Sequence, residues 1–574
     1  MKWSRLFRRD LLVALLLFAA TAAFVFWQNT HIAVLWDLSY LLDTSWRIAI
    51  GQVPYRDFPL VHPPLTFLIQ ALIMRVFGRM YLWPVLYAAL VGGLGTVVAW
   101  RITLRIVSNR VRYAWLVSLL FAVPLIFLGV YGVYPHPIYD CDCAFAIIVA
   151  LYLIQRLDAQ DAAQDWRTWT KPALAGFAVA LPVFFKQNMG VPFLLVVTIG
   201  AVLLLAIGVI RRGADDLASR TMLLRFLAMA VVCLSLGFLI LQWTVGLGNY
   251  LQWTVHFAAQ RRLPGFADML SVYRQPSFFW TIPTLGTGLI LLYLPWARHV
   301  WVRIVTICLA ATPFVSSIIF LFLDDDLDER ADNLLSLWPL LLVAATVFAL
   351  AELRKGITLN RLLPFFVLAA IHGTFLSQQL WGSTYAIWPL LIILIAQMLA
   401  ALPANYPKIA LAFAAVVSTT FLVCGSLYAI GHDRLNYIQP TAGPLYRSQL
   451  PALHGMADRG PYLADFEELV RFAEKEIPQQ DGILLLPGEE PFFYATGRTP
   501  QFPVQIFDNT TDPYTPEQLL EEARKHNIRW VIVKTRLQSN EDPLPARGQT
   551  MGLIGKEYSL TKRLRGYDIY RREP

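Results

Sequence analysis

Residues 63–78 read PPLTFLIQALIMRVFG, an apolar run that two prolines open and that carries Arg75. A transmembrane helix needs about 20 apolar residues, so this run is short for a span. If it crosses a membrane, every segment after it reverses direction. Thirteen other segments are apolar and mostly long enough to span. They lie at residues 11–28, 82–100, 113–131, 142–155, 172–187, 190–210, 222–242, 277–296, 301–322, 333–351, 361–378, 381–401 and 409–429.

The distribution of charge divides the chain into two parts. Of its 574 residues 57% are hydrophobic and only 15% are charged. A soluble domain has about 25% charged residues, so this composition excludes an ordinary soluble enzyme, a disordered chain and a coiled coil. Charged residues make up 26% of residues 430–574 but only 11% of residues 1–429. We therefore expect an α-helical membrane domain over residues 1–429 and a soluble α/β domain over residues 430–574.

Basic residues predict the orientation, because Lys and Arg are enriched in cytoplasmic loops. If residues 63–78 stay on the outer surface, 21 of the 30 basic residues before residue 430 fall inside and nine outside. If the run spans, 11 fall inside and 19 outside. The first arrangement predicts thirteen spans, an uncleaved first helix with a cytoplasmic N-terminus, and an extracytoplasmic C-terminal domain. Its outer stretches are residues 31–80, 132–141, 245–276 and 324–332.

The net charge of +9 reflects how the chain is oriented in the membrane and does not indicate a nucleic-acid partner. The membrane part carries +11 and the soluble part −2, so the basic excess belongs to membrane loops. We therefore expect a lipid bilayer as partner and no nucleic acid. The five cysteines imply no disulfide framework.

The first outer stretch places a carboxylate, Asp37, soon after the first span. Such a group is costly unless it is solvated or paired, which makes it a candidate for function. The alternative is an ordinary loop acid that pairs with Arg47 or Arg56. For Asp43 and Asp57 we prefer that alternative.

The second outer stretch, residues 134–143, reads YPHPIYDCDC and leads into a span. Asp140 and Asp142 stand at a helix start, where acids are favoured by free N–H groups. Helix capping explains one Asp better than it explains both together with His136 and a Tyr. Asp140-x-Asp142 also has the spacing with which some transferases hold a divalent cation, so a cation is compatible with the sequence although none is required.

Cations at the outer ends of spans are candidates for binding a lipid phosphate, since Arg binds phosphate through two donors. Salt bridging or snorkelling to the interface is the alternative for each of them. The candidates are Lys186, Arg261, Arg262 and Arg330.

The first outer stretch resembles the first loop of the GT-C superfamily of integral-membrane glycosyltransferases, which take a sugar from a polyprenyl-phosphate donor. The thirteen spans and outer α/β domain look most like the branch of the lipid A aminoarabinose transferase and the protein O-mannosyltransferases. The resemblance is carried by Asp37-x-x-Tyr40, Arg47, Gly51-x-x-Pro54-Tyr55-x-x-Phe58 and His62-Pro63-Pro64-Leu65.

This resemblance implies that Asp37 and Asp140 are the catalytic acids of the two loops, in a plasma (bacterial inner) membrane enzyme. It implies inverting transfer to a lipid, glycan or protein acceptor. The chain departs from the family in having Leu38 after Asp37, where the family often has Glu. We expect the following residues to contact donor or acceptor: Tyr40, Tyr55, His62, His136 and Asp142.

Two other functions compete with this interpretation. A transporter or flippase of lipid-linked saccharides would place charges near the bilayer midplane. Here the spans are nearly free of acids and the charges gather at one face, which favours a reaction at the surface. A polymerase or ligase would use the same class of donor with an oligosaccharide.

The C-terminal part predicts alternating helices and strands after a polar connector at residues 435–461. We expect helices at residues 465–477 and from Thr515 onward, strands at residues 483–486 and 530–534, and a hairpin within residues 563–572. No nucleotide, zinc or nucleophile motif is present, so we expect an accessory role. A position in a solvated loop would account for Glu489 and Glu490 equally well as a functional role would.

Overall fold

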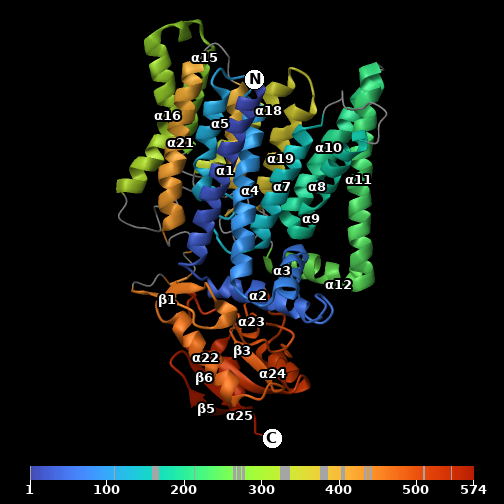
Figure 1. Ribbon diagram of the computed structural model, residues 1–574, viewed down its shortest axis with the longest axis vertical. Coiled ribbons are helices and arrows are strands. Elements are labelled where there is room, and N and C mark those ends of the chain that lie inside the picture. Colours follow the sequence, from blue (N-terminus) through green and yellow to red (C-terminus); the bar gives the residue numbers. More distant parts are fainter. Residues whose placement is uncertain are drawn as a thin grey trace.

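The computed structural model describes all of the chain except residues 1, 109, 158–166, 212–213, 263–264, 266, 268–272, 275–277, 324–336, 375–384, 402–406, 432–434, 436–437, 440–442, 509–510, 545 and 574. A long helical bundle is joined end to end to a smaller α/β domain (Figure 1). The N-terminus lies at the end of the bundle away from this domain, and the C-terminus lies within the domain.

Each of the thirteen expected apolar segments corresponds to a helix or to a pair of helices that a proline interrupts. In the part of the chain that the structure describes, five helical segments are long and apolar enough to cross a membrane by length and composition. Shorter apolar helices accompany them, so this is a membrane protein. The count of thirteen spans stays a prediction. The bundle helices are α1 (Lys2–Asn29), α4 (Leu82–Val107), α5 (Ala114–Ala122), α6 (Leu125–Leu128), α7 (Tyr139–Gln155), α8 (Arg167–Ala180), α9 (Pro182–Phe185), α10 (Gln187–Arg211), α11 (Ala214–Thr244), α15 (Phe278–Tyr293), α16 (Val300–Leu323), α18 (Leu337–Leu353), α19 (Leu359–Gly373), α20 (Trp388–Ala401) and α21 (Pro407–Ile430).

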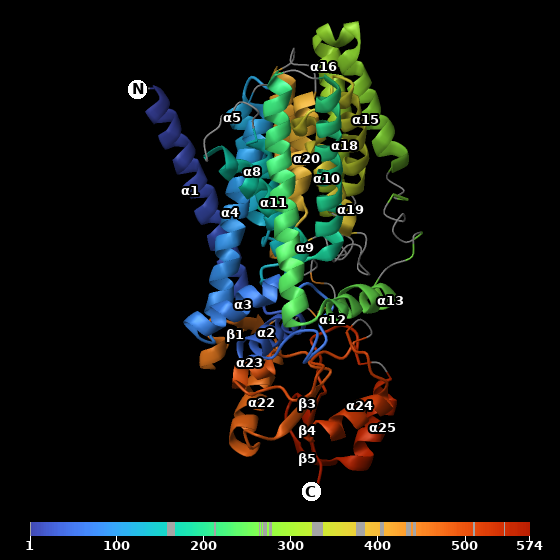
Figure 2. The ribbon, with the colours of Figure 1, turned by 90° about the vertical axis from the view of Figure 1, so that its right-hand side faces the viewer.

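Short helices gather where the bundle meets the α/β domain. The run at residues 63–78 forms α3 (Leu65–Phe77), whose 13 residues rise about 20 Å, less than the hydrocarbon thickness of about 30 Å. It lies beside α2 (Leu35–Ala49) at the domain end of the bundle, together with α12 (Leu247–Leu251), the π-helix η2 (Gln252–Phe257) and α13 (Ala258–Arg262) (Figure 2). Residues 324–332, the fourth expected outer stretch, lie outside the described residues.

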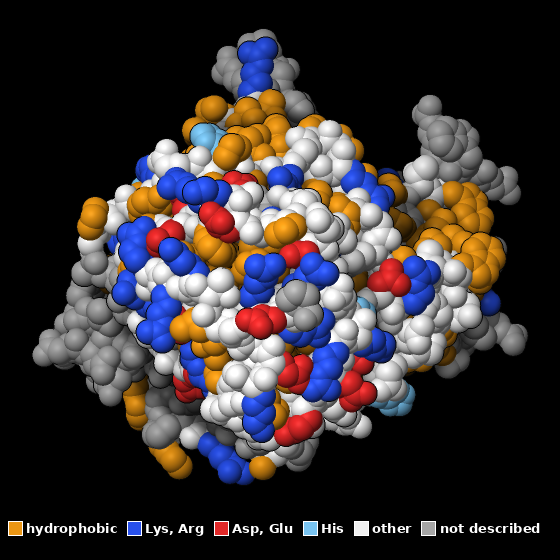
Figure 3. Space-filling view, turned by 90° about the horizontal axis from the view of Figure 1, so that it is seen from below, with side chains coloured by type: hydrophobic (Ala, Val, Ile, Leu, Met, Phe, Trp, Pro, Cys, Tyr) orange, Lys and Arg blue, Asp and Glu red, His pale blue; other side chains and the backbone are white. Residues whose placement is uncertain are grey.

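The C-terminal domain is a four-stranded sheet with helices packed on it. The sheet order is β3-β4-β6-β5; β3 and β4 are parallel, and the other pairs are antiparallel. Its elements are α22 (Tyr462–Glu476), β3 (Gly482–Leu486), α23 (Phe492–Thr496), α24 (Pro516–Lys525), β4 (Ile528–Lys534), α25 (Arg547–Glu557), β5 (Ser559–Arg563) and β6 (Tyr567–Arg571). Its outer face mixes basic and acidic side chains (Figure 3).

Local sequence signals account for most of this domain. Thr515 and Gln518 form a capping box at the start of α24, with Pro516 in the first helical position. The expected connector at residues 435–461 differs, since β1 (Leu445–Arg447) and β2 (Ala457–Arg459) pair within it as an antiparallel sheet. Strands of three residues without apolar alternation carry no period that a sequence could reveal.

Helix α2 is buried between the bundle and the C-terminal domain, and one of its sides is polar. Ser39, Asp43 and Arg47 are spaced four residues apart, so they share that side. Each is at most 2% exposed. Their side chains bond to main-chain groups of the C-terminal domain, at Gly488, Glu490, Phe493, Tyr494 and Phe502.

The expectation that Asp43 is an ordinary loop acid is therefore wrong. Its carboxylate accepts the N–H groups of Tyr494 at 2.6 Å and Phe493 at 3.2 Å, which are in the first turn of α23. Burial raises the pKa of Asp43 to about 7, although these two N–H groups and Arg47 act to lower it.

Replacing Asp43 with Asn should flatten the pH dependence of stability. Between about pH 4 and pH 7, the raised pKa means that Asp43 keeps its proton in the folded protein but loses it in the unfolded chain. The contribution of Asp43 to the free energy of unfolding is therefore largest near pH 4 and falls as the pH rises to about 7. At about 1.4 kcal/mol for each pKa unit, the effect is at most about 4 kcal/mol. Thermal unfolding of the detergent-solubilised protein between pH 4.5 and 8 measures it.

Asp57→Asn is the matched control. Asp57 forms an ion pair with Arg56, and this pair lowers the pKa of Asp57 below its ordinary value. Asp57 therefore titrates below this pH range. If Asp43→Asn and wild type lose stability equally between pH 4.5 and 7, Asp43 does not titrate as described.

Candidate active site

Asp37 lies in the first turn of α2 and faces away from the C-terminal domain. At 100° per residue, Asp37 and Ser39 point to nearly opposite sides of the helix. Since Ser39 bonds to the C-terminal domain, Asp37 points toward the bundle. There it lies close to Tyr134: burial raises the pKa of Tyr134 well above its ordinary value, and the charge of Asp37 raises it further. Asp37 itself is half-buried.

Lys186 occupies the break between α9 and α10. Its backbone is extended, with φ −152° and ψ 116°, where α9 ends after Phe185. The ammonium group forms an ion pair with Asp140 in the first turn of α7, and each residue is 5% exposed. A buried charge is costly unless it is paired, so each of the two groups stabilises the charge of the other.

Aromatic side chains connect this ion pair to α2. The Lys186 Nζ lies 5.3 Å from the centroid of the Tyr139 ring, which stacks on the His62 ring at 3.8 Å. The Tyr40 hydroxyl lies 2.9 Å from His62 Nδ1. Tyr40 is on α2, three residues after Asp37, so the first loop, α7 and the α9–α10 break meet at one place.

The loop between α2 and α3 is held in an uncommon conformation. Tyr55 has φ of 66°, in the left-handed region that a bulky residue rarely adopts. Two contacts hold it there: its N–H donates to Phe58 O at 2.8 Å, and its hydroxyl donates to His62 O at 2.6 Å. Strained backbone of this kind clusters at functional sites, and here it positions His62.

Two of the predicted binding residues form hydrogen bonds to other parts of the chain. Asp142 accepts hydrogen bonds from the hydroxyls of Thr66, Tyr87 and Tyr131 at 2.6–2.7 Å. His136 accepts the Val34 N–H through Nε2 at 3.3 Å, which leaves the proton on Nδ1, 2.8 Å from Asn29 Oδ1.

The Asp-x-Asp motif does not form a cation site in this arrangement. Residues two apart on a helix point to opposite sides, so Asp140 faces Lys186 while Asp142 faces three hydroxyls. Within the described residues, no group of three or more His, Cys, Asp or Glu side chains is placed to hold a metal ion.

Of the three other predicted phosphate ligands, the structure describes the side chain of Arg261 alone. Arg261 is exposed at the end of α13, and its charge acts to lower the pKa of Asp512, which burial raises to about 7, so Arg261 lies near the C-terminal domain. The side chain of Arg262 and all of Arg330 lie outside the described residues.

Sequence analysis missed that the C-terminal domain binds the start of α2. Gln538 accepts the Leu35 N–H at 2.9 Å and donates to Ala33 O at 2.9 Å. The helix cap residue Val34 has no capping side chain of its own. Since Gln538 and Leu35 are 503 residues apart, no local signal could have revealed this contact.

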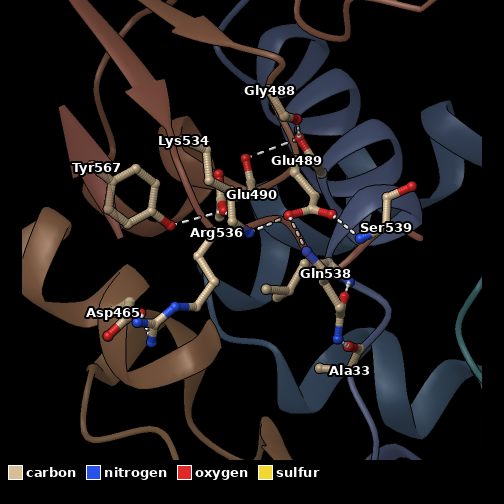
Figure 4. A network of polar contacts seen from close by, with 12 residues as sticks. Ala33, Asp465, Gly488, Glu489, Glu490, Lys534, Arg536, Gln538, Ser539 and Tyr567 are labelled. Atoms are coloured by element: carbon tan, nitrogen blue, oxygen red, sulfur yellow. Dashed lines mark hydrogen bonds and ion pairs between the residues drawn. The ribbon is translucent and has the colours of Figure 1, made fainter. Parts of the chain in front are cut away.

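A buried ionic network holds Gln538 in place (Figure 4). Glu489 accepts the N–H groups of Gln538 and Ser539 at 3.0 and 2.6 Å. Lys534 forms ion pairs with both Glu489 and Glu490, and all three are at most 2% exposed. Burial lowers the pKa of Lys534, but the two carboxylates outweigh it and raise the pKa above its ordinary value. The solvated-loop interpretation of Glu489 and Glu490 is therefore wrong.

Lys534→Met should destabilise the C-terminal domain strongly. It leaves two buried carboxylates without a cation, and breaking a buried pair in this way costs about 3–5 kcal/mol. Lys525→Met, which removes an exposed pair with Glu522, should cost less than about 1 kcal/mol. Thermal unfolding measures both, and equal shifts would contradict the network. Adding Glu489→Gln and Glu490→Gln to Lys534→Met should recover part of the loss.

Comparisons with known proteins were made for sequence and structure. No protein-family model matches this chain, and no curated protein matches it. The structure is similar to ArnT from Cupriavidus metallidurans in the apo state, with a TM-score of 0.48 and 11% identity over 97% of both chains. The comparison with ArnT from Cupriavidus metallidurans bound to undecaprenyl phosphate gives a TM-score of 0.45 and 12% identity, again over 97% of both chains.

The archaeal oligosaccharyltransferase AglB from Archaeoglobus fulgidus, in complex with an inhibitory peptide and a dolichol-phosphate, gives a TM-score of 0.46 and 12% identity. That match covers 92% of this chain and 69% of AglB. ArnT and AglB are glycosyltransferases of the GT-C superfamily, which the first outer loop resembles.

Proposed function

We propose that this chain transfers a sugar from a polyprenyl-phosphate donor to an acceptor hydroxyl, with inversion, at the outer face of the membrane. One observation carries the proposal: the half-buried carboxylate of Asp37 faces the bundle at the end where Lys186, Tyr139 and His62 meet. This end combines an acceptor for a proton with a cation for a phosphate. The resemblance of the first outer loop to that of GT-C enzymes supports the same chemistry.

In the proposed step, Asp37 takes the proton of the acceptor hydroxyl as its oxygen attacks the anomeric carbon. The new carbon–oxygen bond forms on the face opposite the donor phosphate. The bond to the phosphate oxygen breaks, and its electron pair leaves with the polyprenyl phosphate. Because there is one displacement, the anomeric configuration inverts.

Lys186 stabilises the charge that develops on the leaving phosphate. An ammonium group has three donors, and one of them bonds to Asp140. Asp140 thus acts as the residue that positions Lys186. Preorganised cations of this kind contribute several kcal/mol in a water-excluded site.

Asp37→Asn tests the base directly. The amide keeps the size of the side chain but cannot accept the proton, so sugar transfer from a panel of polyprenyl-phosphate sugars should fall by about 10²–10⁴-fold. Asp57→Asn, which changes an exposed carboxylate of the same loop paired with Arg56, should retain wild-type transfer. Full activity of Asp37→Asn would overturn the assignment. Movement of labelled lipid across the bilayer without transfer from any donor would favour a transporter instead.

The proposed orientation has its own test. A reporter fused after Pro574 should be active outside the cytoplasm, because the distribution of basic residues places the C-terminal domain there. A second reporter at the loop between α18 and α19, which carries Arg354 and Lys355, should read as cytoplasmic. The reverse pattern in both fusions would contradict transfer at the outer face.

A further inference from the structure

A cavity lies at the end of the bundle away from the C-terminal domain. It has a volume of about 360 Å³ and is lined by the last turns of α4, α7, α18 and α20 and the first turns of α19. Helix α4 begins at the C-terminal domain, where the Tyr81 N–H donates to Ala452 O. Its 26 residues rise about 39 Å, so the cavity at its last turn is remote from Asp37. Helix α2, which carries Asp37, lies at the other end of the bundle, next to the C-terminal domain (Figure 1). Its volume is in the range of ligand sites.

The lining of this distal cavity is cationic. Arg105, Arg110 and Arg361 line it together with one acid, Glu352, which pairs with Lys355. Arg361 is fixed by donating to Lys355 O at 2.7 Å and Gly356 O at 3.0 Å. Three guanidinium groups around one opening suit a phosphate, which each can bind through two donors.

Two buried amide oxygens in the lining lack partners among the described residues. The Oε1 atoms of Gln155 and Gln397 are buried, and neither has a hydrogen-bond partner in the described part of the chain. Gln155 is only 4% exposed. A buried acceptor without a donor is costly, so these two oxygens indicate a ligand that brings hydroxyl or other donor groups.

An apolar crevice lies next to the distal cavity. Phe348 and Met398 line both the cavity and a second space of about 50 Å³ among α15, α16, α18, α20 and α21. That crevice is narrow and lined mainly by aliphatic and aromatic side chains. A cationic opening next to an apolar crevice fits an amphiphile with an anionic head, rather than a free anion.

We propose that the distal cavity binds one anionic glycerophospholipid of the leaflet on the side of the N-terminus. Its phosphate contacts Arg105, Arg110 and Arg361, its headgroup hydroxyls donate to Gln155 and Gln397, and one acyl chain enters the crevice past Phe348 and Met398. The site is separate from the proposed transfer reaction and does not depend on it.

Binding to the delipidated full-length protein in detergent tests the site. Native mass spectrometry and thermal shift should show one phosphatidylglycerol bound at least tenfold more tightly than phosphatidylcholine, and no stabilisation by inorganic phosphate alone. Equal binding of the two lipids would overturn the role of the arginines. Equal stabilisation by inorganic phosphate would overturn the role of the crevice.

Variants separate this site from a generally basic surface. Arg105→Gln and Arg110→Gln should each weaken phosphatidylglycerol binding by about tenfold, whereas Arg112→Gln, in the same loop but outside the lining, should not. Ala349→Leu, which adds volume inside the lining, should weaken binding while the lipid-free protein keeps its melting temperature. If Arg112→Gln weakens phosphatidylglycerol binding as much as Arg105→Gln does, the residues that line the cavity do not form a specific lipid site.

Discussion

The start of helix α2 is the point on which the rest of the structure depends. The first N–H groups of a helix have no partner within it, and α2 begins without a capping side chain of its own. His136 from the α6–α7 loop accepts the N–H of Val34, and Gln538 from the C-terminal domain accepts that of Leu35. Both parts of the molecule thus meet at two adjacent N–H groups, two and three residues before Asp37. The C-terminal domain therefore binds the start of the helix that carries Asp37, and its expected accessory role stays a prediction.

The polar side of α2 shows why this arrangement needs both parts of the chain. A helix that is buried on two sides must find partners for every polar group on it. Ser39, Asp43 and Arg47 find theirs on the backbone of the C-terminal domain. Apolar residues of α2, among them Leu38 and Leu42, share one core with strands of that domain. Helix α2 is therefore fixed in position, with its remaining face directed toward the bundle. A carboxylate on that face can be held in a single orientation.

Sequence analysis predicted what depends on local composition. Apolar runs predicted the bundle helices, and the Thr515 capping box marked the start of α24. The basic residues favoured an arrangement in which residues 63–78 do not span the membrane. These residues form the short helix α3 at one end of the bundle, and the outer orientation stays a prediction. Asp37, Tyr40, His62 and Lys186 were predicted from the first loop and from charges at the ends of spans, and the structure brings the last three into one cluster.

What could not be predicted depends on partners far away in the chain. Asp43, Glu489 and Glu490 appear in the sequence as ordinary loop acids, because the N–H groups and the ammonium that they bind are 44 to 451 residues distant. Helical geometry is the better guide to such acids. Asp140 and Asp142 are two residues apart, as Asp37 and Ser39 are, and in each pair the helix sends one side chain toward the candidate site and the other into the packing around it. A pair of polar residues at this spacing therefore indicates two different roles on one helix, and it argues against a shared ligand unless the helix is interrupted between them.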